Sequence, residues 1–178
     1  HSYYESAALF HRERIAEIER EARAHQVRYL SSPTALSERF DLSPEVAEKV
    51  ITKLIPRLQR SPIEDYRLDF EDGFGVHPDE YEDTVAIQCA IELVEAMRSE
   101  ALPAFVGIRT KPFNDTSVAR STRTIDLFVK ALVDRSQGKL PNNFVVTLPK
   151  VTSPAQVEAL VAWLDLLEEE CGLPHGAL

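Results

Sequence analysis

The stretch Phe144-Val145-Val146-Thr147-Leu148-Pro149-Lys150-Val151-Thr152-Ser153-Pro154-Ala155-Gln156 predicts a strand, a loop and the start of a helix. Its first part, residues 144–148, is a short apolar run bounded by polar and turn-forming residues, which favours a buried strand. Ser153 can cap a helix whose first position is Pro154, and Gln156 is placed to complete a capping box. A buried strand that leads directly into a helix is the repeating unit of α/β proteins.

The same order of elements occurs twice earlier in the chain. Strands are predicted at residues 66–70 and 104–108, and each is followed by a loop and an amphipathic helix. The three predicted strands begin near residues 66, 104 and 144, at steps of 38 and 40 residues. Strands that alternate with helices in this way indicate a parallel sheet, because parallel strands need long crossover connections.

The regular step favours a TIM (β/α)8 barrel, although a doubly wound open sheet has much the same local pattern. Residues 1–60 are predicted to be mostly helical: one helix has Ile15, Ile18 and Ala22 on its apolar face, residues 31–34 break it, and a second begins at Ser43. Residues 62–178 hold the three strand–helix units. We therefore expect one domain over 1–178, formed by an extra helical region and the first half of a barrel.

Composition and charge narrow the classes of function. The 178 residues are 44% hydrophobic and 28% charged, and 29 acids against 20 lysines and arginines give a formal net charge of −9. This acidic balance argues against nonspecific binding to nucleic acid or to an anionic membrane. Cys89 and Cys171 form no metal-binding pair and are expected to be buried thiols in a reducing cytoplasm.

Charged residues follow each predicted strand, where α/β proteins gather their chemistry. The first loop supplies Asp69, Glu71 and Asp72. The second supplies Arg109 and Lys111, and the third supplies Lys150. One acidic cluster and several cations at a common mouth suit an anionic substrate, with carboxylates organising a metal ion or its water ligands.

Each of these residues also has a simpler interpretation. The acidic turn is then a solvated loop, Arg109 is the structural partner of a buried carboxylate, and Lys111 and Lys150 are solvated charges. His77 lies just after the acidic turn, within reach of the mouth, but a surface position is the simpler expectation for it.

At these loops the sequence resembles the HpcH/HpaI aldolase and citrate lyase β-subunit superfamily. The residues that carry the resemblance are Leu68-Asp69-Phe70-Glu71-Asp72-Gly73, Gly107-Ile108-Arg109 and Thr147-Leu148-Pro149-Lys150-Val151. Residues 62–178 are similar to a bacterial aldolase or citrate lyase-like subfamily of unsettled function. The resemblance implies a TIM barrel and Mg²⁺-dependent cleavage or formation of a carbon–carbon bond in a 2-oxo acid or a CoA thioester.

The resemblance also implies roles for the strand-end residues. Arg109 would bind the substrate carboxylate or polarise its carbonyl, and Lys111 and Lys150 would face the substrate. Glu71 and Asp72 would act in catalysis by positioning Arg109 and, with Asp69, the water ligands of the metal. The direct metal ligands are expected on later strands, beyond Leu178, so the 178-residue piece alone is expected to be inactive.

The resemblance also bears on the oligomeric state, and two alternative functions stay open. The superfamily commonly forms trimers or hexamers, which implies a homo-oligomer. One alternative function is phosphoryl transfer between phosphoenolpyruvate and pyruvate at the same cationic mouth. The other is a non-catalytic binding module derived from a barrel.

Overall fold

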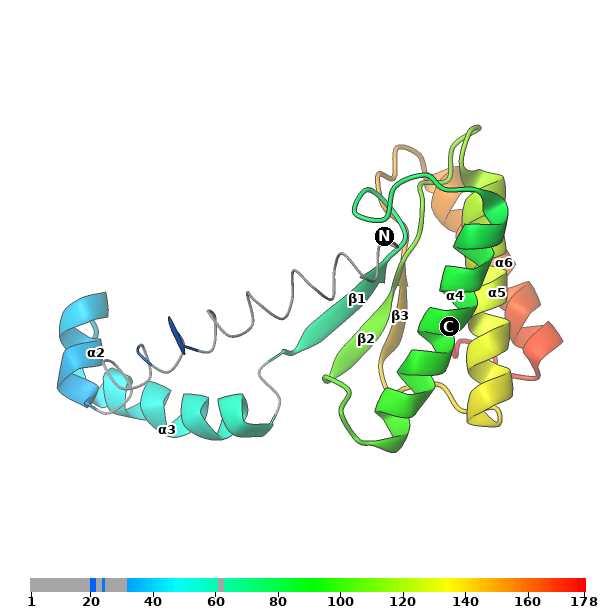
Figure 1. Cartoon of the computed structure of the whole chain (residues 1–178). Helices are drawn as coiled ribbons and strands as arrows, with labels where there is room; N and C mark the ends of the chain where they lie inside the picture. The colour runs from blue at the N-terminus through cyan, green and yellow to red at the C-terminus, as the bar shows by residue number, and fades with distance from the viewer. Residues whose placement is uncertain (1–19, 22–23, 25–31, 61–62) are drawn as a thin grey trace. The chain divides into compact units, whose positions relative to one another are not determined.

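A computed structural model describes residues 20, 21, 24, 32–60 and 63–178 (Figure 1). The chain divides into two compact units, His1–Pro62 and Ile63–Leu178. The boundary coincides with the predicted change from helices to strand–helix units. The helix expected around Ile15, Ile18 and Ala22 lies outside the described residues.

In the first unit, two described helices follow one another along the chain. Helix α2, Pro33–Phe40, begins inside residues 31–34, where a break was expected, because Ser32 caps it: the Ser32 hydroxyl accepts from the amide of Ala35 at 3.4 Å. Helix α3, Pro44–Arg60, begins where it was predicted, and the Ser43 hydroxyl accepts from the amide of Val46 at 3.3 Å. Serine and proline at a helix start supply the cap and a preset backbone angle.

The second unit confirms the predicted α/β pattern. Its elements, in chain order, are β1 (Asp65–Asp69), α4 (Asp79–Arg98), β2 (Phe105–Arg109), α5 (Val118–Ser136), β3 (Phe144–Thr147) and α6 (Pro154–Cys171). The three strands are parallel in the order β1-β2-β3, and Asp69, Arg109 and Thr147 stand in one row of the register. The strand bounds differ from the predicted ones by a single residue. The predicted capping box of α6 is also present, with the Ser153 amide donating to Gln156 Oε1 at 3.1 Å.

The two faces of this sheet differ in chemistry. Figure 1 shows α4, α5 and α6 on the same side of the sheet. The core lies between the sheet and these helices, and Val106 and Ile108 of β2 are fully buried in it with Phe128 of α5. Because side chains alternate along a strand, Gly107 and Arg109 point to the opposite face. We call it the polar face because five of its residues are polar, Asp65, Arg67, Asp69, Arg109 and Thr147; Phe105 and Val145 also lie on it.

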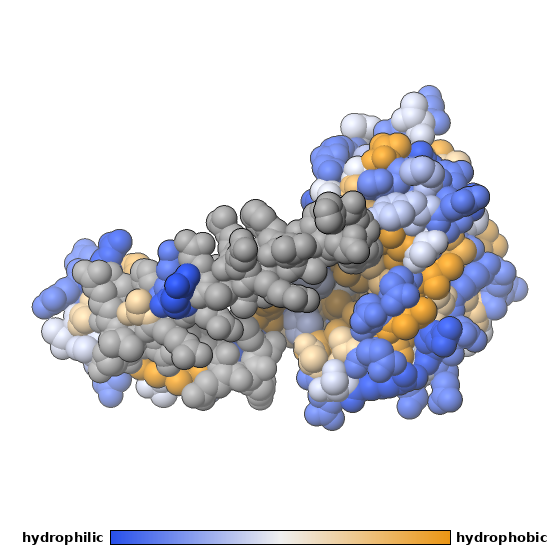
Figure 2. Space-filling model, viewed as in Figure 1, coloured by the Kyte–Doolittle hydropathy of each residue, from blue (hydrophilic) through white to orange (hydrophobic). Residues whose placement is uncertain are grey.

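Two further expectations concern the surface and the cysteines. Hydrophilic residues predominate at the upper end of the second unit in Figure 2, beyond the carboxyl ends of the strands. Cys89 and Cys171, expected to be buried, are only half-buried. None of the described helices is long and apolar enough to cross a membrane.

Candidate functional site

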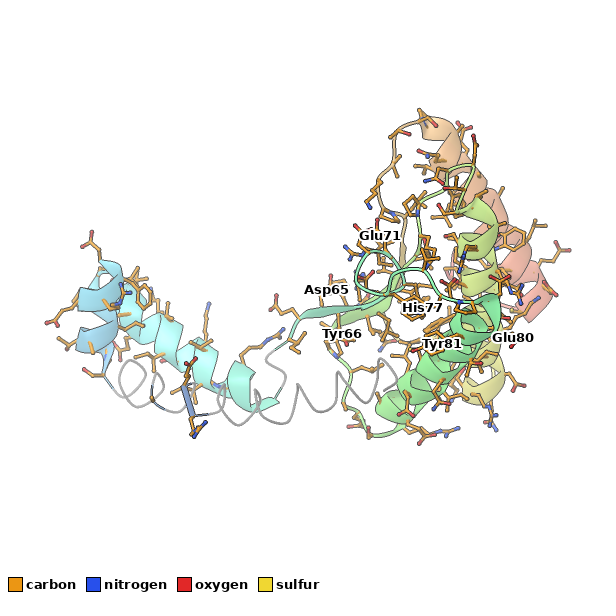
Figure 3. The ribbon with its side chains drawn as sticks, turned by 45° about the horizontal axis from the view of Figure 1, so that its top comes forward. Asp65, Tyr66, Glu71, His77, Glu80 and Tyr81 are labelled. Carbon is orange, nitrogen blue, oxygen red and sulfur yellow. The ribbon has the colours of Figure 1, made fainter. Side chains whose placement is uncertain are left out.

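The loops after the three strands bring five of the six predicted site residues together. We call this cluster the charged mouth: Asp69, Glu71, Asp72, Arg109 and Lys150. Asp69 and Arg109 are register partners at the ends of β1 and β2, while Lys150 follows β3. Glu71 lies just beyond the end of β1 in Figure 3. Parallel strands end at one edge of the sheet, which is why residues about 80 positions apart meet here.

Arg109 is held by two carboxylates. Its Nε and Nη2 donate to the two oxygens of Asp69 at 2.9 and 2.7 Å, and Nε also lies 3.3 Å from Glu71 Oε2. Such a bidentate pair fixes the plane of the guanidinium. The side chain of Arg109 is still 40% exposed, so the guanidinium is oriented and remains accessible.

Asp69 organises the turn as well as the arginine. Its carboxylate accepts from the backbone amides of Glu71 at 2.9 Å and Gly73 at 3.2 Å. A Cβ at position 73 would lie 2.6 Å from Asp69 Oδ2, so a side chain there would push the Asp69 carboxylate out of its present position. The Arg109 guanidinium and these two amides, against the opposing effect of burial, hold the pKa of the Asp69 carboxyl below its usual value.

Lys150 closes the other side of the mouth. Its Nζ donates to both oxygens of Asp72 at 2.9 and 2.8 Å and lies 3.1 Å from Glu71 Oε1. Glu71, only 6% exposed, is thus shared by the two cations. Asp72 and then Glu71 raise the pKa of Lys150 above its usual value, so its ammonium is charged at neutral pH and is neither a base nor a nucleophile. Its backbone has a φ of 52°, a conformation uncommon for lysine.

Lys111 is the predicted site residue that the structure does not bring to the mouth. Its Nζ donates to the carbonyls of Phe70 at 2.8 Å and Gly75 at 2.9 Å, and lies 3.3 Å from Glu82. The residue is 7% exposed. With its donors occupied inside the protein, Lys111 fixes both ends of the acidic turn instead of facing a ligand.

Glu82, Arg120 and His77 extend this contact into what we call the Lys111 network. Glu82 is 5% exposed. Its carboxylate accepts hydrogen bonds from the His77 amide at 3.1 Å and from Arg120 Nε at 3.2 Å, and Arg120 Nη2 lies 2.8 Å from it. Burial alone would raise the pKa of the Glu82 carboxyl, but Arg120, the His77 amide and Lys111 together lower it. Arg120 also donates to the His77 carbonyl. No sequence pattern predicts this network, since Glu82 looks like one acid among several at the start of a helix.

His77 points away from the mouth. Its Nε2 lies 2.8 Å from the carbonyl of Phe74, and its ring packs against Phe74 and Tyr81 with centroids 4.8 and 4.7 Å apart. Figure 3 shows His77 and Tyr81 close together at the start of α4. The histidine therefore stabilises the segment that connects the acidic turn to α4.

The described residues of the mouth do not form a ligand set for a metal ion. Each mouth carboxylate is already paired with Arg109 or Lys150. Among the described residues, the group with metal-like spacing is Asp165, Glu168 and His175 near the end of α6. Both oxygens of Glu168 already accept backbone amides, from Gly176 and Leu178 at 2.8 Å each. Glu168 therefore anchors the last described turn of the chain.

Fold and site together define an α/β protein whose parallel strands end in a cluster of paired charges. The chain belongs to the family described as Domain of unknown function (DUF6986), whose model matches residues 1–178. Comparison with curated proteins and with solved structures found no match. The resemblance to the aldolase and citrate lyase superfamily, with its Mg²⁺, CoA thioester and oligomer, therefore stays a prediction.

Proposed function

We propose that the charged mouth binds a small anionic substrate through Arg109, and that the protein is a carbon–carbon lyase of the aldolase and citrate lyase type. The observation that carries the proposal is the state of Arg109. Two carboxylates hold it, yet 40% of its side chain is exposed at the strand ends. A structural arginine that only neutralised Asp69 would not need to face the mouth.

The geometry of the guanidinium supports binding of a carboxylate. The contacts with Asp69 and Glu71 use Nε and Nη2. The edge formed by Nη1 and Nη2 suits a second planar anion, because a guanidinium presents parallel N–H donors along each edge. A 2-oxo acid would place its carboxylate on this edge, with its carbonyl next to the same cation.

The charge of the mouth bears on the need for a metal. Its three carboxylates carry −3 and its two cations +2, which leaves −1. The net negative charge of the mouth would therefore slightly repel a free anion. A divalent cation bound together with the anion would make the net charge of the mouth positive. This favours the Mg²⁺-dependent chemistry that the resemblance implies, in which the metal stabilises enolate charge. Its direct ligands would then be residues outside the cluster.

The topology supports the barrel. Strands in the order β1-β2-β3, all parallel and with α4, α5 and α6 on one face, follow from right-handed crossovers that step in the same direction. A doubly wound sheet reverses direction and carries helices on both faces. In a barrel, the polar face with Arg67 and Arg109 would line the interior below the mouth.

The proposal is tested by calorimetric titration of the full-length protein with Mg²⁺ plus pyruvate or oxaloacetate. We expect binding of the acid, and a loss of roughly tenfold or more in affinity for Arg109→Lys, since lysine lacks the planar fork. Arg98→Lys, at an exposed arginine paired with Glu95 on α4, is the matched control. Circular dichroism checks that each variant is folded.

The outcomes separate the candidate functions. Near-normal affinity in Arg109→Lys would remove Arg109 from the site. No binding of either acid by the wild type would contradict every catalytic version. Binding with cleavage or condensation of the acid supports the lyase, whereas ATP-dependent phosphorylation of pyruvate supports phosphoryl transfer. Binding without turnover supports a non-catalytic module.

A further inference from the structure

Arg67 is a cation of the polar sheet face that the charged mouth does not include. It lies on β1, two residues before Asp69, and its side chain is 25% exposed. Its Nε donates to Thr147 Oγ1 on β3 at 3.3 Å, and its Nη1 donates to the Tyr66 carbonyl at 3.3 Å and to Asp65. The side chain therefore reaches from the first strand of the sheet to the third.

Gly107 on β2 makes this reach possible. The register places Arg67 beside Gly107, and Gly107 beside Val145. The main chain of β3 leaves no room for a larger residue, since a Cβ at position 107 would lie 1.8 Å from the Val145 carbonyl oxygen. Without a side chain at this position, the path of Arg67 across β2 is open.

This path brings the Arg67 guanidinium to the row of the register that carries Arg109. Thr147, which accepts from Arg67, is the register partner of Arg109. Adjacent strands are about 4.8 Å apart. Arg67 and Arg109 stand diagonally on the same face, one strand and two residues apart, so their Cα atoms are about 8 Å apart. A small molecule with two anionic groups can bridge side chains anchored at that separation.

Pairing with Asp65 does not account for Arg67. The Asp65 side chain is 54% exposed, and ion pairs to exposed partners contribute only about 0–1 kcal/mol. A largely buried guanidinium, by contrast, gains much from a planar anion that replaces its lost water. A solvated carboxylate at the edge of the sheet is a weak partner that a ligand can displace.

We infer that Arg67 is a second anion-binding side chain of the site, and that the substrate is a small acid with two anionic groups. Arg109 binds one group and Arg67 binds the other, while Thr147 orients Arg67. The inference rests on the proposed function, because it places the same substrate at the same mouth. It adds that the second anionic group, a carboxylate or a phosphate, decides specificity.

The test compares acids of equal chain length that differ in one anionic group. The full chain, in the presence of Mg²⁺, is titrated calorimetrically with 2-oxoglutarate and with 2-oxovalerate. Phosphoenolpyruvate and pyruvate form a second pair, which tells a phosphate from a carboxylate. We expect the wild type to bind one dianionic acid at least about tenfold more tightly than its partner, as a charged hydrogen-bonded pair allows.

Arg67→Gln should remove this preference. Its affinity for the dianionic acid should fall roughly ten- to hundredfold, while affinity for the matched monoanionic acid stays within about twofold. Arg109→Gln should weaken both members of a pair. Arg98→Gln on α4 is the charge-matched control and should change neither, and unfolding curves check that each variant is folded.

Three results would overturn the inference alone. The first is that the wild type binds both acids of each pair with equal affinity, a result that needs no variant. Equal weakening of both by Arg67→Gln would give Arg67 a structural role, and no change would leave it no role in binding. In each of these cases the proposed function survives if Arg109→Gln still weakens binding. If the wild type binds none of the acids, the proposed function and the inference fail together.

Discussion

The Lys111 network and the charged mouth share the same acidic turn, but only one of them is open to a ligand. Lys111 and Glu82 are 7% and 5% exposed, and their polar atoms are occupied by carbonyls, an amide and Arg120. In the mouth, the side chains of Lys150 and Asp72 are 56% and 72% exposed. Residue type does not distinguish the two lysines. What distinguishes them is that the donors of Lys111 are all occupied inside the protein, so the network fixes the turn, whereas the side chains of the mouth stay accessible to solvent.

The largest expected change in stability comes from a substitution in the buried Lys111 network. Lys111→Met removes a cation from Glu82 and leaves the Phe70 and Gly75 carbonyls without their donor. Glu82 keeps Arg120, but each buried carbonyl left without a donor costs about 1–3 kcal/mol, and we expect a decrease of about 2–4 kcal/mol in the free energy of unfolding. Urea denaturation measures it. A loss below about 1 kcal/mol would show that the network does not hold the turn.

Lys150→Met is the matched change on the open side. Because water reaches Lys150 and Asp72, we expect the free energy of unfolding to fall by only about 1 kcal/mol. The affinity for a 2-oxo acid should fall more clearly, since the mouth then carries −2 instead of −1. Urea denaturation and calorimetry on the same sample separate the two effects. Equal stability losses in Lys111→Met and Lys150→Met would erase the distinction between the two regions.

The smallest effect concerns pH. The pKa of Asp69 is lowered in the folded protein, chiefly by Arg109, so its contribution to stability is fully present above the unfolded value of about 3.9. It is lost as the pH falls through the lower folded value. The stability difference between wild type and Asp69→Asn should therefore shrink below about pH 4, by a few tenths of a kcal/mol to about 1. Urea denaturation at stepwise lower pH measures it, and a difference that stays constant to pH 3 would contradict the pairing.

Most of the second unit could be predicted from its sequence. Apolar runs such as residues 144–148 and the cap signals at Ser153 and Gln156 depend on neighbouring residues, so a local reading finds them. The common position of Asp69, Arg109 and Lys150 also followed, because parallel strands place their ends at one edge of a sheet. Helix α2 was missed because Ser32 and Pro33 suit a break and a helix start equally well.

The two lysines show where such reasoning stops. If the strand continued, alternation of its side chains would put Lys111 on the same face as Arg109, which lies two residues before it. The chain leaves the extended conformation after Arg109, however, and Lys111 turns under the acidic loop toward Phe70 and Gly75. Arg67 was overlooked for a related reason. Its reach to Thr147 depends on Gly107, a residue on another strand, and no local pattern reveals that contact.

Gly107 has a consequence for how sequence variation at this site should be interpreted. The carbonyl of Val145 occupies the space of a side chain at position 107, so purifying selection should keep a glycine there whatever the substrate. In an alignment this glycine would stand beside Arg109 and look equally invariant, although it contacts no ligand itself. Variation at position 67 carries the information that Gly107 lacks: homologues that have exchanged Arg67 while keeping both Gly107 and Arg109 would be those whose substrates have changed.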